Sequence, residues 1–190
     1  MSLEEDFIYI EKIQQGDLEA LSYIIDKYKD MVYNIALKIV KNSIEAEDIA
    51  QESFIKVYQQ IHSFKKKSKF STWLYTITYR TALYDLRKNK INTQTLINED
   101  HEKLKSPAIS QEESLQNKDK QYFVKLAIDS LSSTEGLLIT LFYIDENSIE
   151  EIQIITGLSK ANIKIKLFRA RKKLRKKLNG LLKDELKNIL

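Results

Sequence analysis

The chain has 190 residues, a formal net charge of +4 and no cysteine. This length accommodates one ordinary domain or two small ones. The lack of cysteine excludes disulfides, thiolate nucleophiles and cysteine-ligated zinc, and only His62 and His101 could supply imidazole to a metal or a catalytic triad. We therefore expect no catalytic residue, no metal and no cofactor. The small positive charge permits a nucleic-acid partner but does not require one.

The composition also argues against membrane insertion and against β-structure. The N-terminal residues MSLEEDFIYIEKIQ are acidic where a secretory signal would be basic, and the strongest apolar run, Leu137 to Ile144, is too short to cross a bilayer. Four glycines and one proline leave little material for tight β-turns, and no long stretch alternates apolar and polar residues. We expect a cytoplasmic, all-α protein without membrane insertion.

Amphipathic helices are expected in the first half of the chain. Apolar residues spaced by threes and fours from Leu18 to Ile39 predict a helix or helix pair that Asp17 caps. A second helix is expected from about Ile44 to Ile61. A third is expected to begin at Ser71 or Thr72, because both residue types cap helices well.

The middle of the chain is interpreted as a linker. The segment from about Ile91 to Asp119 is polar, weakly periodic and contains the only proline, Pro107. Helical periodicity resumes at Lys120. The expected architecture is two small helical domains, residues 1–92 and 120–190, joined by a flexible linker at residues 93–119.

The C-terminal domain contains a helix-turn-helix pattern and is expected to be a four-helix domain. SIEEIQIITG predicts a short helix with Ser148 as its N-cap, Glu151 at the capping-box position and Gly157 as a left-handed C-cap. LSKANIKIK then begins a new helix, which Ser159 would cap. In the helix-turn-helix motif the second helix enters the DNA major groove.

This second helix separates an apolar stripe from a basic face. The stripe consists of Ile163, Leu167, Ala170, Leu174 and Leu178. The residues expected to project away from the core are Lys160, Ala161, Lys164, Ile165, Phe168, Arg169 and Lys172. A merely solvated basic helix usually contains acids for intrahelical pairing, and no acid occurs from Lys160 to Lys177. DNA contact is therefore favoured over simple solvation.

The helix within EAEDIAQESFIKVYQQI has a second organised face. At about 100° per residue, the residues opposite its apolar stripe are Glu45, Asp48, Gln51, Glu52, Ile55 and Gln59. An acidic patch around an exposed isoleucine is typical of a docking surface. The alternative is that the acids only complement the helix dipole and that Ile55 is incidentally exposed.

A basic and aromatic segment, HSFKKKSKFSTWLYTITYRTALYDLRKNK, follows this helix. Positive charge follows a phosphate backbone, and aromatic faces receive unstacked bases at about 1 to 3 kcal/mol each. Single-stranded DNA is therefore the expected ligand. Because aromatic residues at helical spacing more often belong to a core, only one side of the helical wheel is assigned to DNA, together with the loop lysines. That side carries Thr76, Arg80, Tyr84 and Arg87, whereas Tyr75, Ala82 and Leu86 face the other way.

The motifs AEDIAQESFIKVYQQIHSF, FSTWLYTITYRTALYDLRK and LSSTEGLLITLFYIDENSIEEIQIITGLSKANIKIKLFRARKKLRKKL resemble, in order and spacing, the conserved regions of bacterial extracytoplasmic-function (ECF) sigma factors of RNA polymerase. The opening IQQGDLEALSYIIDKYKDMVYNIALKIV is similar to the first helical region of that family. The resemblance covers nearly the whole chain apart from the linker.

The resemblance implies RNA polymerase core, through its β′ clamp and β subunits, and promoter DNA as partners, and an anti-sigma factor is a common further partner in the family. The polymerase-binding residues it implies are Asp48, Gln51, Glu52 and Ile55. The residues that would bind and open the minus-10 element are Lys65, Lys66, Lys67, Lys69, Phe70, Trp73, Thr76, Arg80, Tyr84, Arg87 and Lys88. The residues that would contact the minus-35 element are Ser159, Lys160, Ala161, Lys164, Ile165, Phe168, Arg169 and Lys172.

The chain departs from the family pattern at several positions. Members often have glycine where this chain has Lys66, so the resemblance does not define the shape of that loop. Asparagine is common at the position of Arg80, which weakens inference about the captured minus-10 base. Proline is usual at the position of Ser132, and serine should be tolerated there.

Two other functions compete with a sigma factor. A two-domain helix-turn-helix regulator that acts without being a polymerase subunit would leave the face around Asp48 and Ile55 without a role. A helical interaction protein without DNA activity would not explain the acid-free helix from Lys160 to Lys177. We therefore expect a sigma factor that directs core polymerase to promoters without catalysing a bond change.

Overall fold

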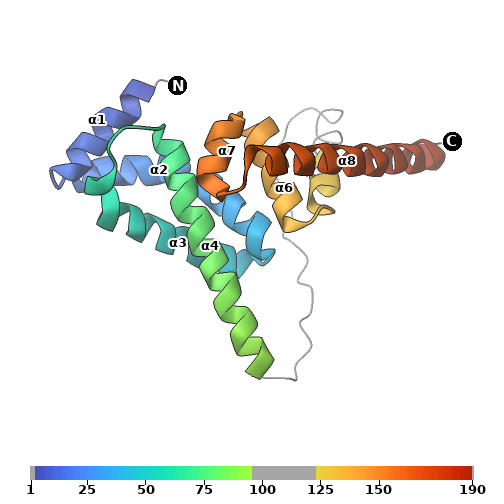
Figure 1. The fold of residues 1–190 in the computed structure, drawn as a ribbon, viewed down its shortest axis with the longest axis horizontal. Helices are drawn as coiled ribbons and strands as arrows, with labels where there is room; N and C mark the ends of the chain where they lie inside the picture. Colours follow the sequence, from blue (N-terminus) through green and yellow to red (C-terminus); the bar gives the residue numbers. More distant parts are fainter. Residues whose placement is uncertain (1–2, 96–122, 190) are drawn as a thin grey trace. The chain divides into compact units, whose positions relative to one another are not determined.

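A computed structural model describes residues 3–95 and 123–189 of the chain (Figure 1). Within these ranges the regular structure is helical, with no β-strand, which confirms the all-α prediction. The chain divides into two compact units, and each is described by itself. The predicted linker, residues 93–119, lies outside the described ranges except for residues 93–95, which are helical. No helix in the described ranges is long and apolar enough to cross a membrane.

The N-terminal unit contains α1 (Leu3–Gln14), α2 (Leu18–Val40), α3 (Ser43–Gln60), the 3-10 turn η1 (Ile61–Ser63) and α4 (Phe70–Thr95). The region from Leu18 is one helix rather than a pair, and the Asp17 carboxylate accepts hydrogen bonds from the backbone amides of Glu19 and Ala20, as predicted. Asn42 caps α3 in the same way. None of the expected helices covers α1.

The predicted N-cap of α4 is wrong. The helix begins at Phe70, so Ser71 and Thr72 lie inside its first turn, and the amide of Trp73 donates to the carbonyl of Lys69. Phe70 is fully buried among core residues of the N-terminal unit. Burial of the Phe70 ring in the core stabilises a helix that begins at this residue. The preference of serine and threonine for N-cap positions indicated a later start.

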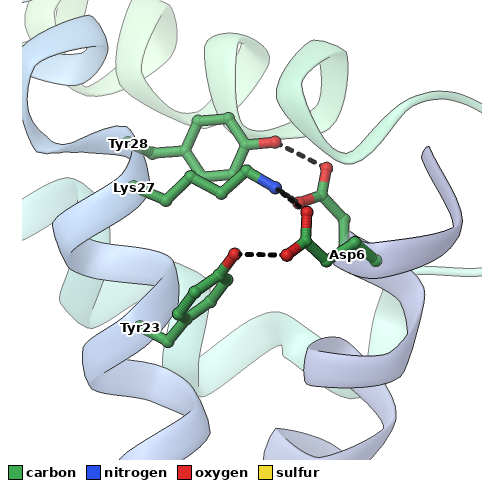
Figure 2. Close-up of polar contacts among 5 residues, drawn as sticks. Asp6, Tyr23, Lys27 and Tyr28 are labelled. Carbon is green, nitrogen blue, oxygen red and sulfur yellow. Dashed lines mark hydrogen bonds and ion pairs between the residues drawn. The ribbon is translucent and has the colours of Figure 1, made fainter. Parts of the chain in front are cut away.

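Paired polar groups hold α1 against α2 (Figure 2). The buried carboxylate of Asp6 accepts hydrogen bonds from Lys27 Nζ and from the Tyr28 hydroxyl, each at 2.6 Å. Next to it, the Tyr23 hydroxyl donates to Glu5 at 2.8 Å. Burial and the hydrogen bond to Asp6 raise the pKa of Tyr28, so its hydroxyl stays protonated and remains a donor.

The loop between η1 and α4 contains a residue with left-handed backbone geometry. Lys66 has φ of +56°, a region that glycine occupies without steric cost. The resemblance described above leads us to expect glycine at this position. Lys66 therefore adopts a left-handed backbone conformation that glycine would adopt at lower cost.

The C-terminal unit contains a helix at residues 123–129, α6 (Ser133–Ile139), a π-helical turn η2 (Thr140–Ile144), α7 (Ile149–Thr156) and α8 (Lys160–Ile189). Its core is built from buried aliphatic side chains that include Leu131, Leu138, Ile152, Ile163 and Leu167. Ser132, where the resemblance leads us to expect proline, has φ of −61°, which proline also adopts, and its hydroxyl caps α6.

Glu135 of α6 joins α8 through hydrogen bonds from Lys173. Both of its carboxylate oxygens accept hydrogen bonds from Lys173 Nζ at 2.8 Å, and one also accepts from the Ser132 hydroxyl at 2.8 Å. Burial alone would raise the pKa of Glu135, but the hydrogen bonds from Lys173 and Ser132 outweigh it and lower that pKa below its ordinary value. The ionised carboxylate is therefore the form that stabilises the contact between these helices.

The first prediction concerns the left-handed backbone at Lys66. Lys66→Gly and Lys66→Ala both remove the side chain, so comparing them isolates the backbone strain. We expect the glycine variant to be more stable than the alanine variant by about 1 kcal/mol, the reverse of the usual order. Urea unfolding of the full chain measures the difference. An alanine variant as stable as the glycine variant would contradict the assigned backbone conformation.

The second prediction concerns the pH dependence supplied by Glu135. Its pKa is lower in the folded than in the unfolded state, so its contribution is complete above the unfolded pKa of about 4.3 and is lost as the pH falls through the folded value. Glu135→Gln should lower the free energy of unfolding by about 1 to 3 kcal/mol at neutral pH. The difference between wild type and variant should shrink under acid conditions. Urea titrations at several pH values test this, and a difference independent of pH would refute it.

Candidate DNA-binding and docking surfaces

The helix-turn-helix forms with the predicted caps. The Ser148 hydroxyl accepts from the amide of Glu151 at 3.2 Å, and the Glu151 carboxylate accepts from the amide of Ser148 at 2.8 Å. Gly157 ends α7 with φ of +72°, and the Ser159 hydroxyl accepts from the amide of Asn162 at 3.3 Å. These local hydrogen bonds determine where α8 begins.

The two faces of α8 are divided as predicted. Ile163, Leu167 and Ala170 are buried, and Leu174 and Leu178 continue this stripe as half-buried residues. The predicted DNA-facing residues are exposed, and they are Ser159, Lys160, Ala161, Lys164, Ile165, Phe168, Arg169 and Lys172. Phe168 is 63% exposed, which is unusual for a large apolar ring and suits a surface that a partner covers.

Acids from other helices pair with part of α8, which the absence of acids within α8 itself does not reveal. Lys160 donates to Glu150 of α7 at 2.6 Å, in addition to the Lys173 pair with Glu135 described above. The hydrogen bond from Lys160 is the largest cause of the lowered pKa of Glu150. Among the described residues, Lys164, Arg169 and Lys172 have no acid within ion-pairing distance.

The predicted docking face of α3 is exposed. Asp48, Gln51 and Glu52 lie at the surface, and Ile55 is 51% exposed. Glu52 forms an ion pair with Lys56 one turn later at 3.2 Å. Two further exposed apolar residues, Ile44 and Tyr58, lie beside this set, and the helical wheel could have identified them.

The basic and aromatic segment divides into surface and core. Lys65, Lys66, Lys67 and Lys69 in the loop are exposed. On α4 the exposed residues are Arg80, Tyr84, Arg87 and Lys88, and Thr76 is half-buried with its hydroxyl donating to the carbonyl of Thr72. Tyr75 and Ala82 are buried and Leu86 is half-buried, as the helical wheel predicted.

The assignment of Phe70 to DNA contact is corrected. Its ring has no exposed surface and packs at right angles to Phe64 and beside Trp73, with ring centroids 5.6 and 5.8 Å apart. A ring that is buried on all sides cannot stack on a base. Trp73 also packs against this core and keeps only part of its surface accessible. Aromatic composition alone could not separate these core rings from the 69% exposed Tyr84.

The candidate surfaces differ from one another in charge. Within the described ranges, no group of histidine, cysteine, aspartate and glutamate side chains could hold a metal ion. The arrangement instead offers an acidic and apolar face on α3 and basic faces on the loop, α4 and α8. Such surfaces suit a protein partner and nucleic acid.

Comparison with known proteins identifies related sequences. A family model described as Sigma-70 region 2 matches residues 24–91, and one described as Sigma-70, region 4 matches residues 124–174. The ECF RNA polymerase sigma factor SigW of Bacillus subtilis (strain 168) is 32% identical over 179 residues, which cover 90% of this chain and 96% of that protein. The ECF RNA polymerase sigma-E factor of Escherichia coli (strain K12) is 30% identical over 187 residues, covering 94% of this chain and 96% of that protein.

Solved structures share the fold. The sigma factor RpoE of Bartonella quintana, in a complex with the anti-sigma factor NepR, aligns with a TM-score of 0.65 and 24% identity over 83% of this chain and 96% of that one. CnrH, in a complex with the cytosolic domain of CnrY, aligns with a TM-score of 0.63 and 18% identity over 92% of this chain and 97% of that one. Given the matched sigma-70 regions and the relatives that span nearly its whole length, the chain belongs to the ECF sigma factors of RNA polymerase.

Proposed function

We propose that this sigma factor binds core polymerase through the exposed face of α3 and binds promoter DNA through two separate basic surfaces. Residues 1–92 would dock on polymerase and open the minus-10 element, and residues 120–190 would bind the minus-35 element. The observation that carries this proposal is the separation of faces, because the residues assigned to partners lie at the surface while the opposite side of each helix is buried. The protein would act in the cytoplasm and would itself catalyse no bond change.

The docking partner is proposed to be the clamp helices of the β′ subunit, with further contacts to β. The face defined by Asp48, Gln51, Glu52 and Ile55 combines charge with apolar surface, as interfaces with a polar rim and an apolar centre do. A regulator that acts without polymerase is not favoured, because the matching relatives named above are sigma factors along nearly their whole length.

The DNA contacts are proposed for residues that have exposed surface. In the N-terminal unit these are Lys65, Lys67, Lys69, Trp73, Thr76, Arg80, Tyr84, Arg87 and Lys88. Lys66 is exposed as well but is left out because its ammonium pairs with Glu11 of α1. In the C-terminal unit they are Ser159 and, on α8, Lys160, Ala161, Lys164, Ile165, Phe168, Arg169 and Lys172. An anti-sigma factor is a further proposed partner, because the first structural relative described above is a sigma factor in a complex with an anti-sigma factor.

A docking experiment tests the polymerase face. Asp48→Lys combined with Glu52→Lys should abolish co-purification with core polymerase, because it reverses the charge of the face. The matched control is Asp26→Lys with Asp30→Lys, which reverses two exposed acids at the same four-residue spacing on α2. The control should retain binding, and circular dichroism should show unchanged helical content in both variants. Undiminished binding of the folded Asp48 and Glu52 variant would remove the assignment.

A DNA-binding experiment separates base contact from simple charge on α8. Lys164 lies near the N-terminal end of the helix, which enters the groove, whereas Lys176 and Lys177 lie about three turns later. Lys164→Ala in the holoenzyme should cost about 1 to 3 kcal/mol and should relax preference at particular minus-35 positions. Alanine at Lys176 and Lys177 should weaken binding to all sequences equally or leave it unchanged.

The measurement is competition binding with single-base variants of the minus-35 element. If Lys164→Ala lowers affinity by the same factor for every variant, Lys164 contacts phosphate. In that case the proposed placement of α8 in the groove is wrong.

A further inference from the structure

Lys66 differs from Lys65 and Lys67 because its side chain contacts residues of α1. Its ammonium forms an ion pair with the carboxylate of Glu11, 55 residues away in the sequence, and lies 5.5 Å from the ring centroid of Phe7. Both partners belong to α1. Lys65 and Lys67, on either side, are exposed and have no acid within ion-pairing distance among the described residues.

Other contacts from α1 reach the same segment, which passes beside this helix in Figure 1. Gln14 Nε2 donates to the carbonyl of Ile61 in η1 at 2.8 Å. The ring of Phe7 packs against the ring of Phe64, with centroids 6.3 Å apart. One face of α1 therefore contacts the chain at the start of the loop and again at Lys66.

The contacts with α1 help to hold the left-handed backbone conformation of Lys66. A lysine in the left-handed region costs free energy and persists only when surrounding contacts hold it there. The ion pair and the Phe7 contact supply such a restraint. This restraint at Lys66 fixes the direction in which the backbone leaves it on either side, toward Lys65 and toward Lys67.

We infer that Lys66 is a positioning residue and not a phosphate contact: through Glu11 and Phe7, α1 sets the loop conformation in which Lys65 and Lys67 meet the opened minus-10 strand. This inference rests on the proposed function of the loop. It gives α1, to which that proposal assigns no contact residue, a role in promoter opening. It also accounts for a lysine at a position where the backbone favours glycine.

The competing possibility makes the opposite prediction for Glu11. If Lys66 contacted phosphate, Glu11 would compete with DNA for its ammonium, and Glu11→Gln would improve promoter opening. If Lys66 positions the loop, Glu11→Gln releases the restraint and promoter opening decreases. The sign of the change therefore separates the two roles.

Exchanging the charges gives the sharper test. Glu11→Lys and Lys66→Glu place like charges together, and each alone should lower the open-complex fraction several-fold. The double variant Glu11→Lys, Lys66→Glu recreates the ion pair in reverse and leaves the net charge unchanged, so positioning predicts recovery to the wild-type level. Permanganate reactivity of minus-10 thymines, measured with holoenzyme over a salt series, reports the open-complex fraction.

The salt series adds a readout that a purely structural role would not change. Loss of one phosphate contact on single-stranded DNA reduces the slope of log affinity against log salt by about 0.7. The charge-exchanged variant should keep the wild-type slope if Lys66 only positions the loop. A reduced slope with no recovery of opening would show that Lys66 contacts phosphate and would overturn the inference.

The matched control uses the adjacent lysine. Lys65→Glu should also impair opening, and adding Glu11→Lys should not rescue it, because Lys65 has no partner on α1. Core-polymerase binding of every variant should equal that of wild type, which excludes misfolding as the cause. If wild-type holoenzyme opens no promoter, the proposed function fails, whereas if it opens promoters but the exchanged pair stays defective, only this inference fails.

Discussion

Burial of one apolar stripe per helix is the constraint on which the rest of this structure depends. The chain has no cysteine for a disulfide, and the described residues hold no cluster suited to a metal, so helix packing must supply the stability of each unit. Because Ile163 and Leu167 face the core, Lys164 and Phe168 must face outward. In α3 the burial of Ala46 and Val57 leaves Asp48 and Ile55 at the surface in the same way. The proposed partner-binding faces are therefore the sides of the helices opposite the packed sides.

Polar contacts between helices fix how those faces are presented. Asp6 accepts from Lys27 and Tyr28 and so joins α1 to α2, and Glu135 accepts from Lys173 and so joins α6 to α8. Both carboxylates are buried, so removing a partner would leave an uncompensated charge, which costs much more than losing an exposed ion pair. Apolar packing would tolerate small rotations of a helix, whereas these hydrogen bonds restrict its position. The Glu135 contact helps to orient α8, which carries the proposed minus-35 contacts.

Features encoded within a few residues could be predicted from the sequence, and features that depend on distant partners could not. Ser148, Glu151 and Gly157 form a local pattern, so the turn before α8 was predicted correctly. The burial of Phe70 was missed because aromatic residues next to lysines suit a DNA surface and a core equally well. The partners of Lys160 and Lys66 lie 10 and 55 residues away, and no periodicity connects them. The role proposed for α1 likewise depends on its contacts with the loop, which no local sequence pattern indicates.

Transcription by a defined polymerase tests the central claim most directly. Core polymerase freed of other sigma factors would be incubated with genomic DNA from the same organism, with and without this protein, and the 5′ ends of the transcripts would be sequenced. The account predicts a new set of start sites that share two upstream sequence elements, one near minus 10 and one near minus 35. Identical start sites in the two reactions, under conditions in which another sigma factor directs initiation by the same core, would contradict it.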